Sequence, residues 1–464
     1  MGVRYDDVIG SLRAAYDGSA KRRDGSGKQP WKLAERAAFL SRVQDGGGRR
    51  LLEVGAGTGQ DSAYFQDNGL DVVAVDLSPA MVDLPGASLD TIAARFYETM
   101  FADRPELLDG LFNRGNQHSG EQRKALAGSI AAFAGALLEH PDVRPDALLA
   151  RIAHKHAAVG VTDDQYVIVH KYLFGAIAEV LGDAVTPQVA AAWDEVYWLM
   201  AGALISLEAR IYAEAGARDG STWRSWQVVE RREETADAVS LVLRPVGDEP
   251  APPARPGQYV SVRMLMPDGV RQQRQYTLSG CGQDGLRSIT VKRVRGGDTP
   301  EGEVSALLHA TVKEGDELTL SAPFGDVSLA DGDAPLVLVS AGIGCTPITA
   351  MLRHLAQTGS SRRVLLVHAD RAKAEHALRQ DMERLADALP SGERIFWYED
   401  GGCGNARTGR MDLADVEIPE GAVVYMCGPL PFMRDARAQL IGAGVAPRDI
   451  HYEVFGPDLW LAAA

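Results

Sequence analysis

The spacing of apolar residues changes along this chain of 464 residues, and each change predicts a separate folding unit. Up to about Asp83, helical and strand-like runs alternate, as in "WKLAERAAFLSRV", "RRLLEVG" and "LDVVAVD", which is the start of an α/β sheet. From Leu89 to about Gly216 the apolar spacing is three-and-four throughout and predicts helices. A chain of this length exceeds one hydrophobic core, so several domains are expected.

Strand patterns dominate after Gly216. Short β-rich runs such as "WQVVER", "VSLVLRPV", "QYVSVRML", "SITVKRV" and "ELTLSAP" are separated by Gly and Pro clusters, as in a small antiparallel barrel, with "GDEPAPPARPG" as a surface loop. From Ala334, buried-type strands alternate with helical patterns, as in a doubly wound parallel sheet. The prediction is a multidomain protein, with a partial α/β segment at 1–84, an all-α domain at 85–218, an antiparallel β-barrel at 219–333 and a doubly wound α/β domain at 334–464.

Charge and cysteine content exclude several classes of partner. The formal net charge of -15 argues against binding to nucleic acid or an anionic membrane surface. The four cysteines lie in the C-terminal half without a C-x-x-C pair, so neither a disulfide framework nor a zinc site is predicted. The N-terminus lacks a signal-peptide core, and no apolar run approaches the ~20 residues of a membrane span. We expect a monomeric cytoplasmic protein with small-molecule partners.

The helical stretch "ALLARIAHKHAAVG" carries two histidines that face different ways. Leu149, Ile152 and His156 fall at i, i+3 and i+7 on one apolar stripe, whereas His154 points nearly the opposite way. A histidine on an apolar stripe can be an ordinary core residue. It can also ligate a metal, and its second ring nitrogen then needs an acceptor.

Other helical segments place polar groups among apolar neighbours. Tyr166 in "DQYVIVH" and Glu208 in "ALISLEARIY" are such residues, and a buried carboxylate needs a partner. Tyr97 adds a hydroxyl to an apolar helix face. Gln122 lies one turn from Leu126 and adds an amide to another face, where a small ligand could bind.

The segments "RFYETMF", "ELLDGLFNRGNQ", "GEQRKALAGSIAAFA", "RIAHKHAAVG" and "EARIYAEAG" together resemble the globin domain of flavohaemoglobins. The resemblance implies that His156 is the proximal iron ligand of haem b. It also implies that Tyr97 and Gln122 steady dioxygen on the distal side, where Phe112 and Leu126 wall the pocket.

On the proximal side, the same resemblance assigns Tyr166 and Glu208 to the hydrogen bonds around the ligating histidine. Lys155, next to the ligand, also matches the family pattern. An anionic acceptor behind the imidazole raises its donor strength and favours activated-oxygen chemistry over simple reversible binding.

The runs "RPGQYVSV" and "RQYTLSG" carry residues suited to a flavin. Arg274 can neutralise a diphosphate, Tyr259 and Tyr276 offer flat faces, and Thr277 can hydrogen-bond the ring edge. The pair resembles the FAD-binding barrel of ferredoxin-reductase-like enzymes, with "GEVSALLH" and "APFGD" in the expected order. The implied FAD contacts are Tyr259, Arg274, Gln275, Tyr276 and Thr277.

A glycine turn, "SAGIGCTP", follows the buried strand "PLVLVS" and allows close backbone approach to a pyrophosphate at a helix start. Together with "YMCGPLPFM" and "HYEVFGP", where Phe455 would shield the flavin, it resembles the nicotinamide-binding module of the same reductases. The implied contacts are Gly342, Ile343, Gly344, Cys345, Thr346, Pro347, Cys427, Gly428, Glu453, Val454, Phe455, Gly456 and Pro457.

By this resemblance, electrons pass from NAD(P)H through FAD to haem b, and the protein acts as a nitric oxide dioxygenase that turns NO and O2 into nitrate. The alternative is a haem and flavin oxygen sensor or an NADH-dependent reductase with the same cofactors. Asp370 and Arg371 both follow the second strand near where a ribose 2′ group would lie, and NADH is slightly favoured.

The N-terminal "LLEVGAGTGQD" resembles the first motif of class I S-adenosylmethionine methyltransferases, with Glu53, Gly55, Gly57 and Asp76 as the implied contacts. Two strands leave a sheet with open edges and no substrate wall, so we expect this motif to be idle. A methyltransferase is the less favoured alternative. The chain also leaves almost no room for the roughly four-turn helix that precedes the Tyr-bearing helix in flavohaemoglobins.

Overall fold

In the computed structural model, most of the chain from Pro30 to Gly456 is described. The described residues are 30–45, 49–54, 60–75, 87–109, 111–112, 126, 129, 132–133, 136, 145–182, 185, 187–217, 222–248, 250–282, 285–296, 301–401, 404 and 406–456. Within them, no helix has both the length and the apolar character needed to cross a bilayer.

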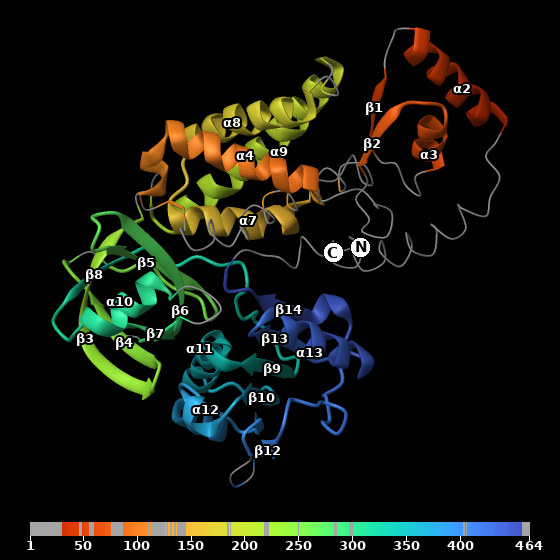
Figure 1. Ribbon diagram of the computed structural model, residues 1–464. Helices are drawn as coiled ribbons and strands as arrows, with labels where there is room; N and C mark the ends of the chain where they lie inside the picture. Colours follow the sequence, from red (N-terminus) through yellow and green to blue (C-terminus); the bar gives the residue numbers. More distant parts are fainter. Residues whose placement is uncertain are drawn as a thin grey trace.

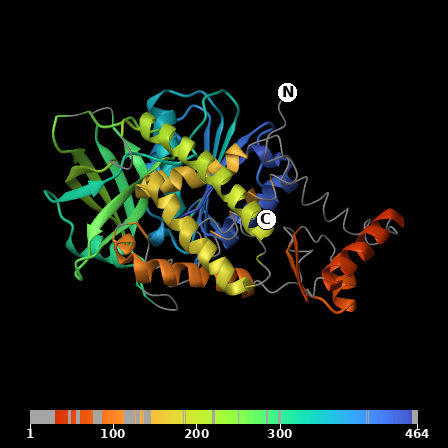
Figure 2. The ribbon, with the colours of Figure 1, turned by 90° about the horizontal axis from the view of Figure 1, so that it is seen from above.

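The N-terminal unit is a fragment of an α/β sheet. Its elements are α2 (Pro30–Asp45), β1 (Arg50–Val54), α3 (Gln60–Asp67) and β2 (Asp71–Val75). The two strands pair in parallel, with Arg50 opposite Asp71. Its buried apolar side chains form a small cluster of their own, made of Leu40, Phe65, Leu70 and Val72. Figures 1 and 2 show this unit to one side of the helices that follow.

The helical domain follows the three-and-four spacing of its sequence. Its described elements are α4 (Ala87–Asp103), the 3-10 turn η1 (Pro105–Leu108), α7 (Asp146–Val159), α8 (Asp163–Leu181) and α9 (Pro187–Glu214). Helix α4 packs along α8, and α7 packs along α9. Thr162 caps α8 through a capping box with Gln165, which fixes where that helix begins. Helix α8 contributes side chains to both apolar clusters of the domain.

Six antiparallel strands close into a barrel in the order β3-β4-β7-β6-β5-β8. The barrel elements are β3 (Arg224–Thr235), β4 (Ala238–Pro245), β5 (Tyr259–Leu265), β6 (Arg271–Cys281), β7 (Arg287–Lys292), helix α10 (Glu303–Thr311) and β8 (Glu317–Leu320). Because side chains alternate along a strand, β5 has two different faces. Val260 and Val262 point into the barrel core, whereas Tyr259 belongs to a cluster outside it. Strand β6 contains the run "RQYTLSG", which belongs to the flavin site predicted from the sequence.

The C-terminal domain is a six-stranded parallel sheet in the order β12-β11-β10-β9-β13-β14. Helices α11 and α12 pack into the core on one face, and α13 into the core on the other, which confirms the doubly wound prediction. Chain order reverses between β9 and β13, and ligands of such sheets bind at this reversal, outside the carboxyl ends of the strands. The elements are β9 (Leu336–Ala341), η3 (Gly342–Gly344), α11 (Cys345–Gln357), β10 (Val364–Asp370), η4 (Lys373–Glu375), α12 (Arg379–Asp387), β11 (Gly392–Tyr398), β12 (Arg407–Thr408), β13 (Val423–Cys427), α13 (Leu430–Gly442), η5 (Pro447–Asp449) and β14 (Ile450–Glu453).

Helix α7 contacts both C-terminal domains (Figure 1). The Ser261 hydroxyl of β5 donates to the carbonyl of Ala158 over 2.6 Å. On the other side, Lys155 Nζ donates to the carbonyl of Gly456, just after β14, over 2.8 Å. The helix that carries His156 therefore lies between the barrel and the end of the parallel sheet.

Candidate functional site

His156, Tyr166 and Glu208 meet in the interior of the helical domain, one from each of α7, α8 and α9. His156 Nδ1 lies 2.8 Å from Glu208 Oε1 and 3.0 Å from the Tyr166 hydroxyl, which itself donates to Glu208 Oε1 over 2.6 Å. Glu208 is 3% exposed. Burial, and then the charge of Glu208, raises the pKa of Tyr166, so the phenol stays protonated and donates.

This geometry fits an axial ligand of haem iron. Because the Tyr166 hydroxyl donates a hydrogen bond to Glu208, the Nδ1–H of His156 donates to the same carboxylate, and Nε2 keeps its lone pair. The described residues offer Nε2 no hydrogen bond. A neutral imidazole with Nδ1 anchored in this way is the usual proximal donor to haem iron.

His154 faces the barrel. Its Nδ1 accepts the backbone N–H of Gly325 over 3.2 Å, and burial lowers the pKa of its imidazole. On the opposite face of α7, Leu149 is fully buried and Ile152 packs against the same cluster. The helical period therefore separates the two histidines as the sequence predicted.

The structure brings together three of the residues predicted on the distal side. Tyr97 is 7% exposed and belongs to the same apolar cluster as Phe112 and Leu126. The ring centroids of Tyr97 and Phe112 lie 6.0 Å apart in an edge-to-face arrangement. Gln122 lies outside the described residues.

On the barrel, Tyr259 and Thr277 are direct neighbours across β5 and β6. Thr277 is 4% exposed, and its hydroxyl has no hydrogen-bond partner in the described part of the chain. Burial raises the pKa of both Tyr259 and Tyr276. A buried hydroxyl without a partner is costly, and a flavin ring edge would satisfy it.

The Tyr259 ring lies close to a glycine backbone. A Cβ on Gly325, whose φ is +125°, would come within 3.2 Å of the Tyr259 ring carbons. Arg274 Nη1 donates to the carbonyl of Gln273 over 2.8 Å, while the exposed Gln275 donates to the Ser261 hydroxyl over 3.5 Å. Tyr259, Gln275 and Thr277 share one face of β5 and β6, outside the barrel core. Arg274 and Tyr276 lie on the other face, where Tyr276 packs against the barrel core. The unpartnered Thr277 hydroxyl beside Tyr259 on the outer face fits a flavin ring edge.

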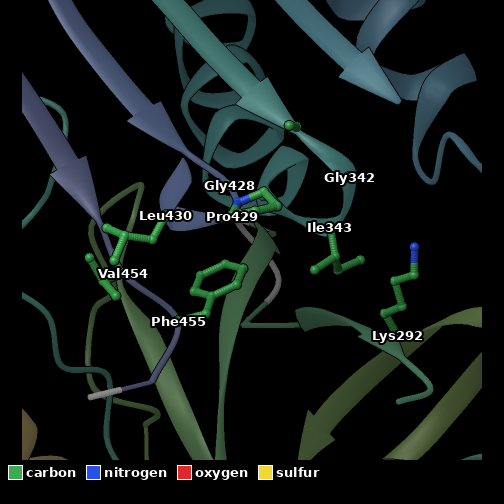
Figure 3. A pocket seen from close by; sticks show the side chains of 10 residues that line it. Lys292, Gly342, Ile343, Gly428, Pro429, Leu430, Val454 and Phe455 are labelled. Atoms are coloured by element: carbon green, nitrogen blue, oxygen red, sulfur yellow. The ribbon is translucent and has the colours of Figure 1, made fainter. Parts of the chain in front are cut away.

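At the reversal between β9 and β13 lies a cavity of about 410 Å³. Figure 3 shows Ile343, Phe455 and Lys292 around this opening. A Cβ on Gly344 would fall 2.3 Å from the carbonyl oxygen of Cys427 and 2.8 Å from the nitrogen of Gly428. Only glycine fits at position 344. Because it has no side chain, the turn after β9 can lie directly against the end of β13 beneath the cavity. The cavity is lined by Lys292, Ala341, Gly342, Ile343, Gly344, Gly428, Pro429, Leu430, Val454 and Phe455.

The start of α11 meets this cavity with its backbone. The Cys345 thiol contacts the carbonyl of Ala377 at 3.5 Å, and the Thr346 hydroxyl donates to the carbonyl of Ile343 over 3.1 Å. Both side chains and Pro347 are buried, and burial raises the pKa of Cys345. What this turn offers a phosphate is its backbone N–H groups.

Glu453 is a buried carboxylate between α7 and the parallel sheet. Its Oε1 accepts the N–H of Val454 over 3.1 Å, and Oε2 has no partner in the described part of the chain. Burial raises the pKa of Glu453 to about 7, helped by Asp326 and opposed by Lys155 and Arg151. Cys427 is buried beside it, and burial also raises the pKa of this thiol.

Two residues at these sites, Lys292 and Arg151, are not among the site residues predicted from the sequence. Lys292 is the last residue of β7 and lines the cavity, and its Nζ lies 3.8 Å from Asp237 Oδ2. Arg151 Nε lies 3.3 Å from Asp326 Oδ2, and its guanidinium stacks over the Tyr452 ring at 4.5 Å. Arg151 lies one turn before Lys155 on the same face of α7, which is the only hint available in the sequence.

Asp370 is turned inward at the end of β10. Its Oδ1 accepts the N–H of Arg371, its Oδ2 lies 3.6 Å from His368 Nε2, and its side chain is 5% exposed. Arg371 is exposed and pairs with Glu375 over 2.6 Å. The geometry therefore leaves the preference for NADH as a prediction.

Several predicted contacts fall where the structure gives no side chain. Gly55, Gly57, Asp76 and Pro457 lie outside the described residues, and Glu53 lies in β1 without a described side chain.

Three family models match the chain. The globin model matches residues 94–204, the oxidoreductase NAD-binding domain model matches residues 338–438, and the methyltransferase domain model matches residues 52–113. The globin match covers α7, α8 and most of α4, and the oxidoreductase match covers the β9 and β13 strand ends. A globin joined to such a module defines an NAD(P)H-dependent oxidoreductase.

Relatives match over most of this architecture. The flavohemoprotein of Bordetella pertussis is 42% identical over 79% of this chain and 94% of its own length. That of Rhizobium meliloti is 38% identical over 80% of this chain and 94% of its own. The crystal structure of a flavohemoglobin from Malassezia yamatoensis, with bound FAD and heme, has a TM-score of 0.74 and 39% identity, covering 80% of this chain and 95% of that one. The chain belongs to the flavohaemoprotein family.

Proposed function

We propose that this chain is a nitric oxide dioxygenase, which converts NO and O2 to nitrate with electrons from NAD(P)H. The observation that carries the proposal is the buried Glu208 carboxylate held on His156 Nδ1, because such an acceptor favours activated oxygen over reversible binding. When bound, haem b would supply the iron for dioxygen chemistry, FAD would pass reducing equivalents on singly, and NAD(P)H would provide them.

The globin residues would act on the two sides of the haem, the proximal side and the distal side. His156 Nε2 would hold the iron, while Glu208 and Tyr166 keep the imidazole in one tautomer and orientation. Tyr97 and Phe112 would exclude bulk water from the distal side, and the Tyr97 phenol would donate to a bound diatomic ligand.

In the C-terminal half, Thr277 would donate to the flavin ring edge, and Tyr259 would support the ring. The backbone around Gly344 would take the dinucleotide diphosphate, with the Lys292 ammonium as the nearby positive charge. Phe455 is 48% exposed at the cavity and would cover the flavin until nucleotide binds.

Nitrate formation tests the proposal directly. The reduced, oxygenated protein is mixed with NO in a stopped-flow instrument, and nitrate is measured against nitrite. Rapid stoichiometric nitrate is expected. Steady NADH oxidation with artificial acceptors, without any gain from NO, would instead indicate a reductase or an oxygen sensor.

The ligand assignment has its own test. His156→Ala should lose the haem Soret band while keeping flavin absorbance, because it removes the imidazole whose Nδ1 is held by Glu208. His154→Ala is the matched control on the same helix and should retain haem. The opposite pattern would overturn the assignment.

We also propose that the domains divide after residues 84, 218 and 333. Each boundary falls between the last described helix or strand of one domain and the first of the next, that is, between Val75 and Ala87, between Glu214 and Arg224, and between Leu320 and Leu336. Limited proteolysis with mass analysis of the fragments tests them. A monomer remains the prediction for sedimentation of the purified protein, and the N-terminal segment is expected to bind no S-adenosylmethionine in calorimetry.

A further inference from the structure

The C-terminal end of α7 draws on the barrel for two of its hydrogen bonds. A helix leaves its last four carbonyls without intrahelical donors. In α7, the carbonyls of His156 and Ala157 are taken by the chain's own turn, through the N–H groups of Gly160 and Val161 at 3.0 to 3.2 Å. The next two carbonyls accept from the barrel instead.

Ser261 and Gln273 are the two barrel donors. The Ser261 hydroxyl donates to the Ala158 carbonyl over 2.6 Å, and Gln273 Nε2 donates to the Val159 carbonyl over 3.3 Å. Ser261 is 0% exposed and Gln273 is 6% exposed, so neither bond can be replaced by bulk water. The donors come from the adjacent strands β5 and β6, which form the proposed flavin face.

Small side chains allow this close approach. Ala157 and Ala158 are both fully buried, and they share a cluster with Tyr259 and Phe324 of the barrel region. His156 precedes these alanines directly, and its imidazole is fixed on the other side by Glu208. A displacement of the barrel against α7 therefore moves the peptide units that adjoin His156.

We propose that Ser261 and Gln273 are positioning residues for His156. By donating to the last carbonyls of α7, they hold this helix against the barrel, and they couple the barrel's position to the position of the His156 imidazole, which would ligate the haem iron. This inference rests on the proposed haem and flavin sites, but it does not depend on NO or nitrate.

The test compares Ser261→Ala with Ser279→Ala in the full chain loaded with haem and FAD. Ser279 is a matched control, because it is 2% exposed on β6 and its hydroxyl donates to the carbonyl of Ser288 inside the barrel. Hydrogen exchange at Gly160 and Val161 should accelerate about fivefold in Ser261→Ala, the factor expected for one buried hydrogen bond. It should be unchanged in Ser279→Ala.

Two further readouts separate positioning from mere stability. In Ser261→Ala, the iron–histidine stretching band of the ferrous haem should shift or broaden, and flavin-to-haem electron transfer under anaerobic conditions should slow. Reduction of the flavin by NADH should keep its rate. If Ser261→Ala does not accumulate as folded protein, Gln273→Leu removes the neighbouring donor and gives the same three readouts.

Unchanged exchange, vibrational band and transfer rate in the folded variants would overturn the inference. Equal effects in Ser279→Ala would do so as well, because they would reflect general loosening of the barrel. Failure of the nitrate assay alone would overturn the proposed reaction and leave the positioning role standing.

Discussion

Glu453 should destabilise the folded protein above neutral pH, and Glu453→Gln should relieve that cost. Burial raises the pKa of this carboxyl from its ordinary value near 4.5 to about 7, and the attraction of Lys155 and Arg151 only partly opposes the rise. Since each pKa unit corresponds to about 1.4 kcal/mol, the ionised carboxylate costs the folded state roughly 3 kcal/mol.

The sign follows from proton binding. The folded state holds the Glu453 proton more tightly than the unfolded chain, so stability falls as pH rises from about 4.5 to about 7 and stays lowered above that range. Glutamine carries no charge and escapes this loss. The advantage of Glu453→Gln should therefore be small at pH 5 and should approach roughly 3 kcal/mol at pH 8.

Native-state hydrogen exchange measures this difference within one domain, which avoids treating a multidomain unfolding curve as two-state. Strand β13 pairs with β14, which ends at Glu453, so its amide protection factors report opening of this region. At pH 8 they should be about a hundredfold higher in Glu453→Gln than in the unaltered protein. Glu420→Gln is the control, because Glu420 is exposed in the same domain.

Equal protection of the unaltered protein and Glu453→Gln at pH 8 would refute the reasoning. A gain of the same size at pH 5 and pH 8 would also refute it, because the cause would then be packing and not charge. A gain in Glu420→Gln of similar size would point to the net charge of the whole protein.

Three other changes test separate parts of the structure. Gly344→Ala should weaken NADH binding at least about tenfold, because its Cβ meets the Cys427 carbonyl; Gly442→Ala, with open space around it, should bind NADH normally in the same titration. Glu208→Gln should retain haem yet slow NO-dependent NAD(P)H oxidation by about tenfold or more, and an unchanged rate at equal haem content would argue against its role. On heating, the globin should release haem at a lower temperature than a relative with a full first helix, as followed by the Soret band. Equal release would mean that residues 1–84 substitute for the missing helix.

Much of the fold could be predicted because it depends on short-range patterns. The three-and-four spacing of the helical domain and the buried apolar strands of the parallel sheet are properties of neighbouring residues, and α7 to α9 and β9 to β13 follow them. The stripe of α7 also separated His156 from His154 correctly, since helical geometry is the same in any context. The sequence did not show that β8 pairs with β3 to close the barrel, because pairing between distant strands leaves no local pattern.

The candidate site also has features that the sequence predicts and features that only the tertiary structure shows. Residue types and motif order identify His156, Glu208 and Gly344 as candidate site residues, because residue spacing and side-chain chemistry are properties of the sequence itself. Tertiary structure alone decided that Tyr166 donates to a carboxylate 42 residues away, that Asp370 turns inward, and that Ser261 closes the helix carrying His156. Hydrogen bonds between distant segments depend on how helices and strands pack, and packing is a property of the whole fold.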